Sequence, residues 1–313
     1  MKYKALVIAA KMPQNANECK PLMRLGTSTI IENVIQNFQG AGVTDITVVT
    51  GYKAESLEKY LAGKGIDFCF NCNFAESHMM DSICLGLRQL GEDFDYVLIT
   101  PGDVPLVKPE TIRAMLCRRA EVVRVSLDGR AGHPVMLSKS VAKELLGYQE
   151  EYGGLRSFLE QYRDVTAYVN VDDQGILLKA DTSEDYKNLR KLDIEHKSSG
   201  GLWLDMRVSI NKKDFILTPE TAQFLKMIDC TGSLRMACSA MYMSYTKGWQ
   251  LLNRMEEDLG YKLVTRTVGG EKGGRSEMTS EGRQLLERYH AFMEALTQVA
   301  NDLFTKNFSG GAQ

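Results

Sequence analysis

The chain has 313 residues, which favours two domains, because a domain averages roughly 150 residues. Its residues are 44% apolar and 25% charged, a composition that fits a globular protein and excludes disordered and collagen-like chains. The formal charge of −2 gives no overall sign of nucleic-acid binding. No apolar run approaches the roughly 18 residues of a membrane span, and the start lacks a signal-peptide pattern, so we expect a cytoplasmic protein with no membrane partner.

The seven cysteines are an odd number at irregular spacings, which predicts free thiols in a reducing compartment. Cys69 and Cys72 form a C-x-x-C pair, but they lie in an apparent strand, and no second pair completes a zinc site. We therefore expect no zinc ion at this pair of cysteines.

The first part of the chain alternates short apolar strands with amphipathic helices, a pattern typical of βαβ units and a parallel sheet. In such a sheet ligands bind outside the carboxyl ends of the strands, so we expect the site at the loops that follow Ala10 and Thr100. The predicted strands span residues 4–9, 45–50, 67–71 and 96–100, and the predicted helices span residues 28–39, 54–61 and 80–90.

A polar segment at residues 193–201 ends in small residues, as linkers do. Beyond this segment the alternation of strands and helices stops, and the pattern becomes mainly helical. We therefore expect two domains, at residues 1–192 and 202–306, and a disordered tail at residues 307–313.

The second domain carries clear helix-start signals. Thr218, Ser233 and Ser244 are suitable N-caps, and Pro219 suits the first helical position. A turn that contains glycine, at residues 231–233, separates two of the helices. The predicted strand spans residues 202–210, and the predicted helices span residues 219–230, 233–240, 245–259 and 280–304.

Five motifs occur in order within the first 190 residues. They are Ala9-Ala10 with Lys20, residues 73–83, Thr100 to Leu106, Gly132 to Val135, and residues 181–186. Together they resemble the MobA-like nucleotidyltransferase family, which includes the guanylyl- and cytidylyltransferases of molybdenum cofactor synthesis. They correspond to its LAAGxSxRMGxxK signature, its base-side loop, and its GDxP, GHPV and DTPEDY elements. The resemblance implies an α/β fold with a Rossmann-like, doubly wound, mostly parallel sheet.

The resemblance also implies roles for single residues. Lys20 and Asp103 are the implied catalytic residues, Lys20 by neutralising phosphates and Asp103 by holding Mg²⁺ bound to them. Asp181 is the implied second metal ligand, although Lys179 stands where the family often has another aspartate, and His133 is implied to line the substrate pocket. The implied nucleotide-binding residues are Ala9, Ala10, Lys11, Lys20, Ser82, Gly102 and Asp103.

The signature loop departs from the family pattern at Lys11, Pro13, Asn15 and Asn17. Nucleotidyl transfer needs backbone N–H groups and cations around the triphosphate, and the family's glycines and arginine supply them. Pro13 donates no backbone hydrogen bond, and Asn15 carries no charge. These departures argue against normal catalysis, although Lys11 restores one positive charge and Lys20 is kept.

The second domain has the outline of a helix-turn-helix module with a wing. Two predicted strands around a glycine-rich tip, at residues 263–278, precede a long amphipathic helix. This part of the chain resembles the winged helix-turn-helix domain of the molybdate-responsive regulator ModE, which is related to LysR-type regulators. The resemblance implies that a homodimer binds operator DNA, with the long C-terminal helix as the dimer surface.

The same resemblance implies which residues meet DNA. The first turn of a recognition helix reaches base edges, and a wing contacts phosphates or the minor groove. Arg266 is expected to add a backbone contact, Trp249 and Leu252 are expected in the core, and the acidic run at residues 256–258 counts against DNA binding. The implied DNA-binding residues are Ser244, Tyr245, Thr246, Lys247, Arg254, Lys272 and Arg275.

Three hypotheses follow. The altered phosphate loop beside an intact wing favours a DNA-binding transcriptional regulator, whose nucleotidyltransferase-like domain senses a nucleotide, pterin or molybdopterin-like ligand. The alternative is an active Mg²⁺-dependent nucleotidyltransferase that transfers CMP or GMP to a molybdopterin-type phosphate, with the second domain for dimerisation or autoregulation. In the third, the second domain is only a protein-interaction module.

Overall fold

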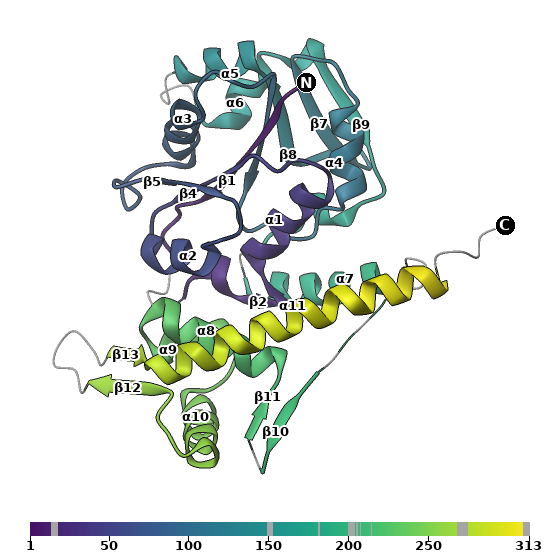
Figure 1. Ribbon diagram of the computed structural model, residues 1–313. Coiled ribbons are helices and arrows are strands. Elements are labelled where there is room, and N and C mark those ends of the chain that lie inside the picture. Colours follow the sequence, from purple (N-terminus) through teal and green to yellow (C-terminus); the bar gives the residue numbers. More distant parts are fainter. Residues whose placement is uncertain are drawn as a thin grey trace. The chain divides into compact units, whose positions relative to one another are not determined.

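The computed structural model describes residues 1–13, 18–148, 153–180, 182–199, 204, 206, 208–213, 215–267 and 275–308. The chain forms two compact units, an N-terminal unit at Met1–Asp193 and a C-terminal unit at Ile194–Gln313 (Figure 1). None of the helices in the described ranges has both the length and the apolarity that a membrane crossing requires. All seven cysteines are free, which confirms the prediction of free thiols.

The N-terminal unit is built on a seven-stranded sheet. Its strands are β1 (Tyr3–Ala9), β4 (Ile46–Thr50), β5 (Asp67–Phe70), β6 (Tyr96–Pro101), β7 (Val122–Leu127), β8 (Arg130–Ser138) and β9 (Thr166–Asn170). Their order across the sheet is β5-β4-β1-β6-β8-β7-β9. Strand β8 runs antiparallel to both of its neighbours, whereas the other pairs are parallel. The expected Rossmann-like, mostly parallel sheet is therefore confirmed.

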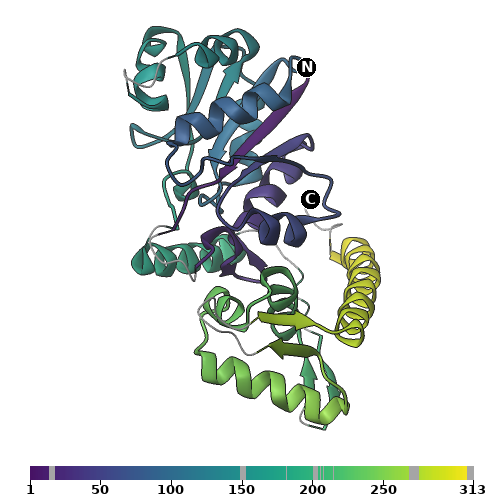
Figure 2. The same ribbon diagram turned by 90° about the vertical axis from the view of Figure 1, so that its left-hand side faces the viewer.

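Helices cover both faces of this sheet. They are α1 (Ile30–Gly40), α2 (Ala54–Leu61), α3 (Met79–Leu90), α4 (Pro109–Leu116), α5 (Lys139–Leu146) and α6 (Leu155–Glu160). A further helix, α7 (Ser183–Ser199), begins in this unit and continues past its last residue, Asp193. α3 and α5 lie on one face, and α1 and α4 lie on the other (Figure 1 and Figure 2). The predicted bounds of α2 are confirmed, whereas α7 continues through residues 193–199, which were expected to form a linker.

A close approach between α3 and the sheet fixes one face of the core. The apolar side of α3, with Ile83, packs with Leu6 of β1 and Leu145 of α5 in one buried cluster. Gly86 permits this approach, because a Cβ at that position would lie 2.4 Å from Cδ1 of Leu6. The packing holds the first turn of α3, and the loop before it, against the carboxyl ends of the strands.

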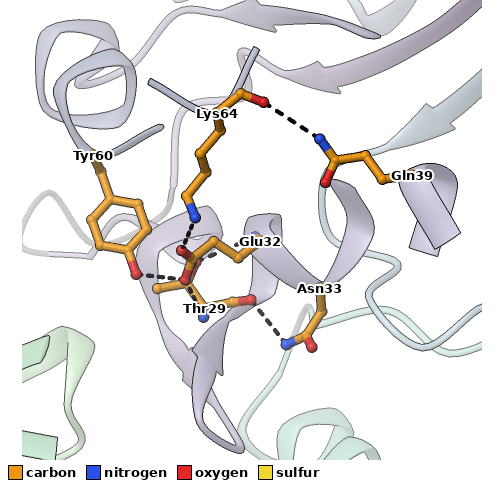
Figure 3. Close-up of polar contacts among 6 residues, drawn as sticks. All are labelled: Thr29, Glu32, Asn33, Gln39, Tyr60 and Lys64. Carbon is orange, nitrogen blue, oxygen red and sulfur yellow. Dashed lines mark hydrogen bonds and ion pairs between the residues drawn. The ribbon is translucent and has the colours of Figure 1, made fainter. Parts of the chain in front are cut away.

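A buried carboxylate joins the start of α1 to two other segments (Figure 3). Glu32 accepts hydrogen bonds from the Tyr60 hydroxyl (2.6 Å) and the Thr29 backbone N–H (3.1 Å). Lys64 Nζ lies 2.9 Å from Glu32 Oε1. Burial alone would raise the pKa of Glu32, but Lys64 and these hydrogen bonds together lower it. The carboxylate therefore stays ionised and ties α1, α2 and the segment before β5 together.

The C-terminal unit contains helices and short hairpins within its described residues. They are β10 (Ile210–Lys212), β11 (Phe215–Leu217), α8 (Pro219–Thr231), α9 (Leu234–Ala240), α10 (Tyr245–Leu259), β12 (Val264–Thr267), β13 (Arg275–Met278) and α11 (Ser280–Phe308). Thr218, Ser233 and Ser244 each accept a backbone hydrogen bond from the helix that follows, which confirms the three predicted N-caps.

The strand predicted at residues 202–210 is confirmed at Ile210 and wrong at the other positions that the structure describes. Residues 204, 206, 208 and 209 are not in a strand, and the other positions before Ile210 lie outside the described residues. Pairing begins at Ile210, which lies opposite Leu217 in the β10–β11 hairpin. Alternation is not sufficient for a strand, because the backbone also needs a partner, and β11 reaches no further than Ile210.

Helices α9 and α10 pack closely, and β13 joins the turn before them. A Cβ on Gly248 of α10 would lie 2.3 Å from Sγ of Cys238 on α9. The Ser276 backbone N–H donates to the carbonyl oxygen of Gly232 (2.8 Å), and the Leu234 N–H donates to Ser276 Oγ (3.4 Å). The β12–β13 hairpin is therefore part of the helical fold and not a separate arm.

Candidate functional site

The carboxyl ends of β1 and β6 bring two predicted segments together. Gly102 N–H donates to the carbonyl oxygen of Ile8 (2.8 Å), and a Cβ on Gly102 would lie 3.1 Å from that of Ala9. Ala9 and Ala10 are buried directly before the signature loop, and Asp103 is half-buried directly after Gly102. This edge of the sheet is where parallel α/β sheets bind their ligands.

Two hydrogen bonds fix the loop that carries Asp103. The carbonyl oxygen of Asp103 accepts from the Ala180 N–H (2.9 Å), and the Asn37 side chain of α1 donates to the carbonyl oxygen of Pro105 (2.8 Å). Asp181, the second predicted metal ligand, follows this segment but lies outside the described residues. The loop therefore has a defined backbone at the edge of the sheet.

A magnesium ion could use Asp103 together with phosphate oxygens and water. No group of three or more His, Cys, Asp or Glu in the described ranges is arranged to hold a metal ion. Mg²⁺ does not require such a group, because it is commonly bound through one or two carboxylates plus substrate phosphates. Asp103 fits that mode, in which the nucleotide itself supplies most of the negative ligands.

The signature loop is described only in part. Lys20 begins the short 3₁₀ helix η1 (Lys20–Leu22) and is half-buried, whereas Lys11 is exposed. Asn15 and Asn17 lie outside the described residues. Cys19 is buried beside Lys20, and burial raises the pKa of its thiol to about 11. This thiol is therefore protonated at neutral pH and is a poor nucleophile.

Ser82, predicted to contact the nucleotide, is buried and engaged within the protein. Asn71, at the end of β5, donates through Nδ2 to Ser82 Oγ (3.0 Å) and to Ser77 Oγ (2.8 Å). Asn71 Oδ1 accepts from the Asn73 N–H (3.0 Å), an Asx turn that orders the loop before α3. This role of Asn71 was not predicted, although asparagine at the end of a strand is a turn signal. A cavity of about 570 Å³ borders this loop, and Asn71 and Ser77 line it.

His133 lies on β8, where this reversed strand starts at the carboxyl edge of the sheet. Val135 pairs with Arg124 of β7, so the residues before Val135 lie toward that edge. Within the described part of the chain, His133 Nδ1 is buried and makes no hydrogen bond. Burial, together with the nearby Lys179 and Arg124 charges, lowers the pKa of His133 to about 4. The ring is therefore neutral at pH 7, beside two cations to which the sequence assigned no role.

The first turn of α10 is exposed. Ser244, Tyr245, Thr246 and Lys247 all reach solvent, and Ser244 Oγ accepts the Lys247 N–H (3.3 Å). Arg254 is also exposed, about two helical turns after Lys247 and so on the same side of the helix. These five residues, together with Trp249, are called the α10 surface below.

Trp249 is 43% exposed, so its expected place in the core is wrong, whereas Leu252 is buried as expected. The Arg266 guanidinium of β12 lies 5.9 Å from the centre of the Trp249 ring. Arg235 of α9 lies at the same distance, 5.9 Å, from the Tyr245 ring. Cation–ring contacts at these distances are attractive, so each ring helps to hold an arginine at the α10 surface.

The β12–β13 hairpin carries two of the predicted cations. Arg266 lies opposite Ser276, and Thr267 lies opposite Arg275, next to the tip of the hairpin. Arg275 Nε lies 2.9 Å from Glu277 Oε1, so part of its charge is compensated locally. Lys272, another of the residues predicted to meet DNA, lies outside the described residues.

Glu256, in the acidic run of α10, is 4% exposed. Its Oε1 accepts the N–H groups of Leu263 (3.0 Å) and Val264 (3.1 Å), and Lys262 Nζ lies 2.7 Å from its Oε2. The carboxylate anchors the start of β12, and Lys262 offsets its charge. Glu256 therefore counts less against an anionic partner than the sequence suggested.

Helix α11 exposes apolar side chains at regular intervals. Phe292, Val299 and Leu303 are 48%, 56% and 55% exposed, and Leu296 lies between them. Their spacing follows the alternating four- and three-residue steps of a coiled-coil seam. Nearer the start of the helix, Tyr289 is buried in the C-terminal unit. The later part of α11 therefore presents a seam suited to another helix.

Residues 5–165 match the family model of the MobA-like NTP transferase domain. A nucleotidyl transferase from Methanothermobacter thermautotroptrophicus is 21% identical, with a TM-score of 0.55 over 62% of this chain and 99% of that one. Rv0371c from Mycobacterium tuberculosis is also 21% identical, with a TM-score of 0.54 over 61% of this chain and 98% of that one. A structure of Rv0371c in complex with manganese is also similar, with a TM-score of 0.51. These similarities show the fold of the N-terminal unit.

Two curated relatives carry the name bifunctional protein GlmU. The protein from Chromohalobacter salexigens is 29% identical over 139 residues, and that from Hydrogenobaculum sp. is 30% identical over 115 residues. These matches cover 42% and 36% of this chain, and 30% and 24% of the relatives. The chain therefore spans less than a third of the length of the curated relatives it matches.

Proposed function

Because the chain belongs to the MobA-like NTP transferase family, we propose that its N-terminal unit senses a nucleotide or molybdopterin-like ligand and that its C-terminal unit binds operator DNA. In this proposal the protein is a cytoplasmic transcriptional regulator of molybdenum cofactor or molybdoenzyme metabolism. It joins a MobA-like domain to a winged helix-turn-helix domain of the ModE and LysR type.

The α10 surface is the observation that supports DNA binding best. Its first turn offers hydroxyl, phenol and ammonium groups, which can meet base edges in the major groove. Lys247 and Arg254 share one side of the helix, and Arg235 and Arg266 are held beside it on aromatic rings. Several cations on one face, with Glu256 buried behind them, form the electrostatic footprint expected of a DNA-binding helix.

The connections of the C-terminal unit fit this assignment. Helix α9, a short turn and α10 follow one another as in a helix-turn-helix module, and the β12–β13 hairpin occupies the position of a wing. The bond between Ser276 and Gly232 fixes the hairpin to the turn before α9. The seam on α11 would join two copies, and a homodimer would present two α10 surfaces to two half-sites.

Selection of duplexes from a random pool by the full-length protein tests this function. We expect one sequence class to be enriched and to bind with strong salt dependence. Replacing Lys247 with alanine should weaken binding about tenfold and reduce the slope of log affinity against log salt by about one, the loss of one phosphate contact.

Lys139, a lysine of the N-terminal unit whose side chain is 38% exposed, provides the matched control. Lys139→Ala should leave both the affinity and the salt slope unchanged. No enrichment by folded protein, or equal effects of the two variants, would contradict the proposal and would favour a protein-interaction module.

The second candidate is an active Mg²⁺-dependent nucleotidyltransferase that transfers CMP or GMP to a molybdopterin-type phosphate. The observation in its favour is the position of Asp103 beside Ala9 and Ala10 at the carboxyl edge. The manganese complex of Rv0371c adds support for a divalent cation in proteins of this fold. When bound, Mg²⁺ would offset the charge of the phosphates, Asp103 would hold it, and Lys20 would hold the phosphates.

Calorimetric titration with CTP, GTP and ATP, with and without Mg²⁺, separates the two candidates. Tight binding of one nucleotide that requires Mg²⁺ and is lost in Asp103→Asn, followed by pyrophosphate release in the presence of acceptor, would favour the enzyme. Nucleotide binding without turnover would favour the sensor.

A further inference from the structure

An arginine outside the set that the sequence implied for DNA contact lies beside the α10 surface. This residue is Arg235, the second residue of α9, and its guanidinium lies over the ring of Tyr245. We propose that Arg235, positioned by the Tyr245 ring, binds one backbone phosphate of the DNA through a bidentate pair of hydrogen bonds. The inference rests on the proposed DNA binding of the C-terminal unit, and it names the group on the DNA that this pair recognises.

The start of α9 holds the backbone of Arg235 in place. Ser233 caps the helix, because its side chain accepts the Met236 N–H, and the Leu234 N–H donates to Ser276 Oγ (3.4 Å). Leu234 and Met236, the two neighbours of Arg235 in the chain, are buried, whereas Arg235 is exposed. The buried neighbours therefore fix this turn against the core and leave Arg235 at the surface.

The packing of α9 against α10 brings the arginine and the tyrosine together. A Cβ on Gly248 of α10 would lie 2.3 Å from Sγ of Cys238 on α9. Arg235 lies three residues before this cysteine, and Tyr245 lies three residues before this glycine. Residues three apart are neighbours on a helix surface, so both side chains lie next to the contact between the helices. The resulting distance from the guanidinium to the centre of the ring is 5.9 Å.

The N–H groups of Arg235 are free for a ligand. Within the part of the chain that the structure describes, Arg235 has its ring contact but no hydrogen bond and no ion pair. By contrast, Arg266, the arginine over Trp249, donates to Asn253 Oδ1 (3.3 Å). An arginine held over a ring still has the donors at the edge of its guanidinium, and two of them match two oxygens of a phosphate. The Tyr245 ring therefore restricts the Arg235 side chain and leaves its donors open.

The position of Arg235 favours the DNA backbone over the bases. In a helix-turn-helix module the second helix enters the major groove, and the first helix crosses the backbone. Arg235 belongs to α9, the first of these two helices, and Tyr245 belongs to the first turn of α10, the second. A side chain at the start of the first helix, beside the reading turn, meets the strand that borders the groove. The ligand of Arg235 is therefore a phosphate and not a base edge.

Binding of the full-length protein to a selected duplex tests the role of Arg235. We expect Arg235→Met to weaken binding about tenfold and to reduce the slope of log affinity against log salt by about one, the loss of one phosphate contact. Arg235→Lys should keep the salt slope, since it keeps the charge, but should bind about threefold more weakly, since lysine cannot form the bidentate pair. Arg118→Met, at an exposed arginine of the N-terminal unit, should bind like the parent.

Variants of Tyr245 test its positioning role. Tyr245→Leu removes the ring and should weaken binding about threefold to tenfold, whereas Tyr245→Phe, which keeps the ring, should bind more tightly than Tyr245→Leu. In the Arg235→Met background, Tyr245→Leu should have a smaller effect than in the parent, because the ring acts through the arginine. Fully additive effects of the two substitutions would overturn the positioning role.

Duplexes with a single neutral methylphosphonate linkage locate the contact. At one linkage in each half-site, loss of the phosphate charge should weaken the parent about tenfold and leave the binding of Arg235→Met unchanged. If no linkage behaves in this way, or if 7-deazaguanine in place of guanine abolishes the difference between parent and variant, the phosphate contact is overturned while the proposed DNA binding stands. Absence of DNA binding by the folded parent would overturn both.

Discussion

Gly248 lies so close to Cys238 that a Cβ on the glycine would be 2.3 Å from the cysteine sulfur. Because this contact sets the distance between α9 and α10, we expect Gly248→Ala to lower the free energy of unfolding by about 1–3 kcal/mol, the usual effect of overpacking. Chemical denaturation followed by helix content measures this loss.

A second substitution checks the cause. Cys238→Ala removes the sulfur, so the double variant Gly248→Ala with Cys238→Ala should recover part of the loss, a coupling expected only between residues in contact. Additive effects of the two substitutions would show that the contact does not set the stability.

Glu256 and Glu257 are neighbours with different environments, and they form a matched pair. Glu256→Ala leaves the buried N–H groups of Leu263 and Val264 without their acceptor, so we expect a loss of about 2–3 kcal/mol. Glu257 is exposed, and Glu257→Ala should change stability by no more than about 0.5 kcal/mol. Urea denaturation of both variants measures the difference, and equal effects would contradict the anchoring role of Glu256.

The buried Glu32 makes the stability of the N-terminal unit depend on pH. Since the fold lowers the pKa of Glu32, its stabilisation is complete above the ordinary carboxyl value of about 4.3 and is lost as pH falls through the lower folded value. We expect Glu32→Gln to cost about 1–3 kcal/mol at pH 7 and less as the pH falls below about 4. Denaturation at several pH values tests this, and a difference independent of pH would count against an ionised Glu32.

Trp249 should matter for DNA affinity more than for folding. Because the ring is 43% exposed, Trp249→Ala should change stability by only about 1 kcal/mol. Loss of the ring frees Arg266, so DNA affinity should fall about threefold to tenfold, whereas Trp249→Phe should keep most of it. Fluorescence anisotropy with a selected duplex measures both, and an alanine variant that binds like the parent would remove Trp249 from the α10 surface.

Local patterns in the sequence predicted helices better than surfaces. The bounds of α2 and α10 are those predicted, because amphipathic periodicity and a cap such as Ser244 are encoded within the helix itself. Trp249 was expected in the core because of its apolar ring, but the ring is 43% exposed and lies beside Arg266 of a later strand. A strand predicted from alternation alone is absent at the described residues before Ile210, because its partner β11 is too short to pair with them.

In the candidate site, too, some features were predicted from the sequence and others were not. The rule for parallel sheets predicted that the segments after Ala10 and Thr100 meet at one edge, and the structure places Ala9 beside Gly102. The same rule could not predict that Asn71 donates to the Ser82 hydroxyl, or that Arg124 pairs with Val135 of the strand that carries His133. Both depend on which strands become neighbours and in which direction they run.

The reversed direction of β8 also decides where this fold can accept changes in sequence. A two-residue turn, Asp128-Gly129, joins β7 to β8 with φ values of 49° and 76°, as in a tight β-hairpin. Because β8 starts at the ligand edge, this turn is the part of the hairpin nearest to that edge, while the pairing from Val135 onward lies deeper in the sheet. We therefore expect insertions or substitutions at this hairpin tip to change the surface at that edge while the central sheet keeps its pairing.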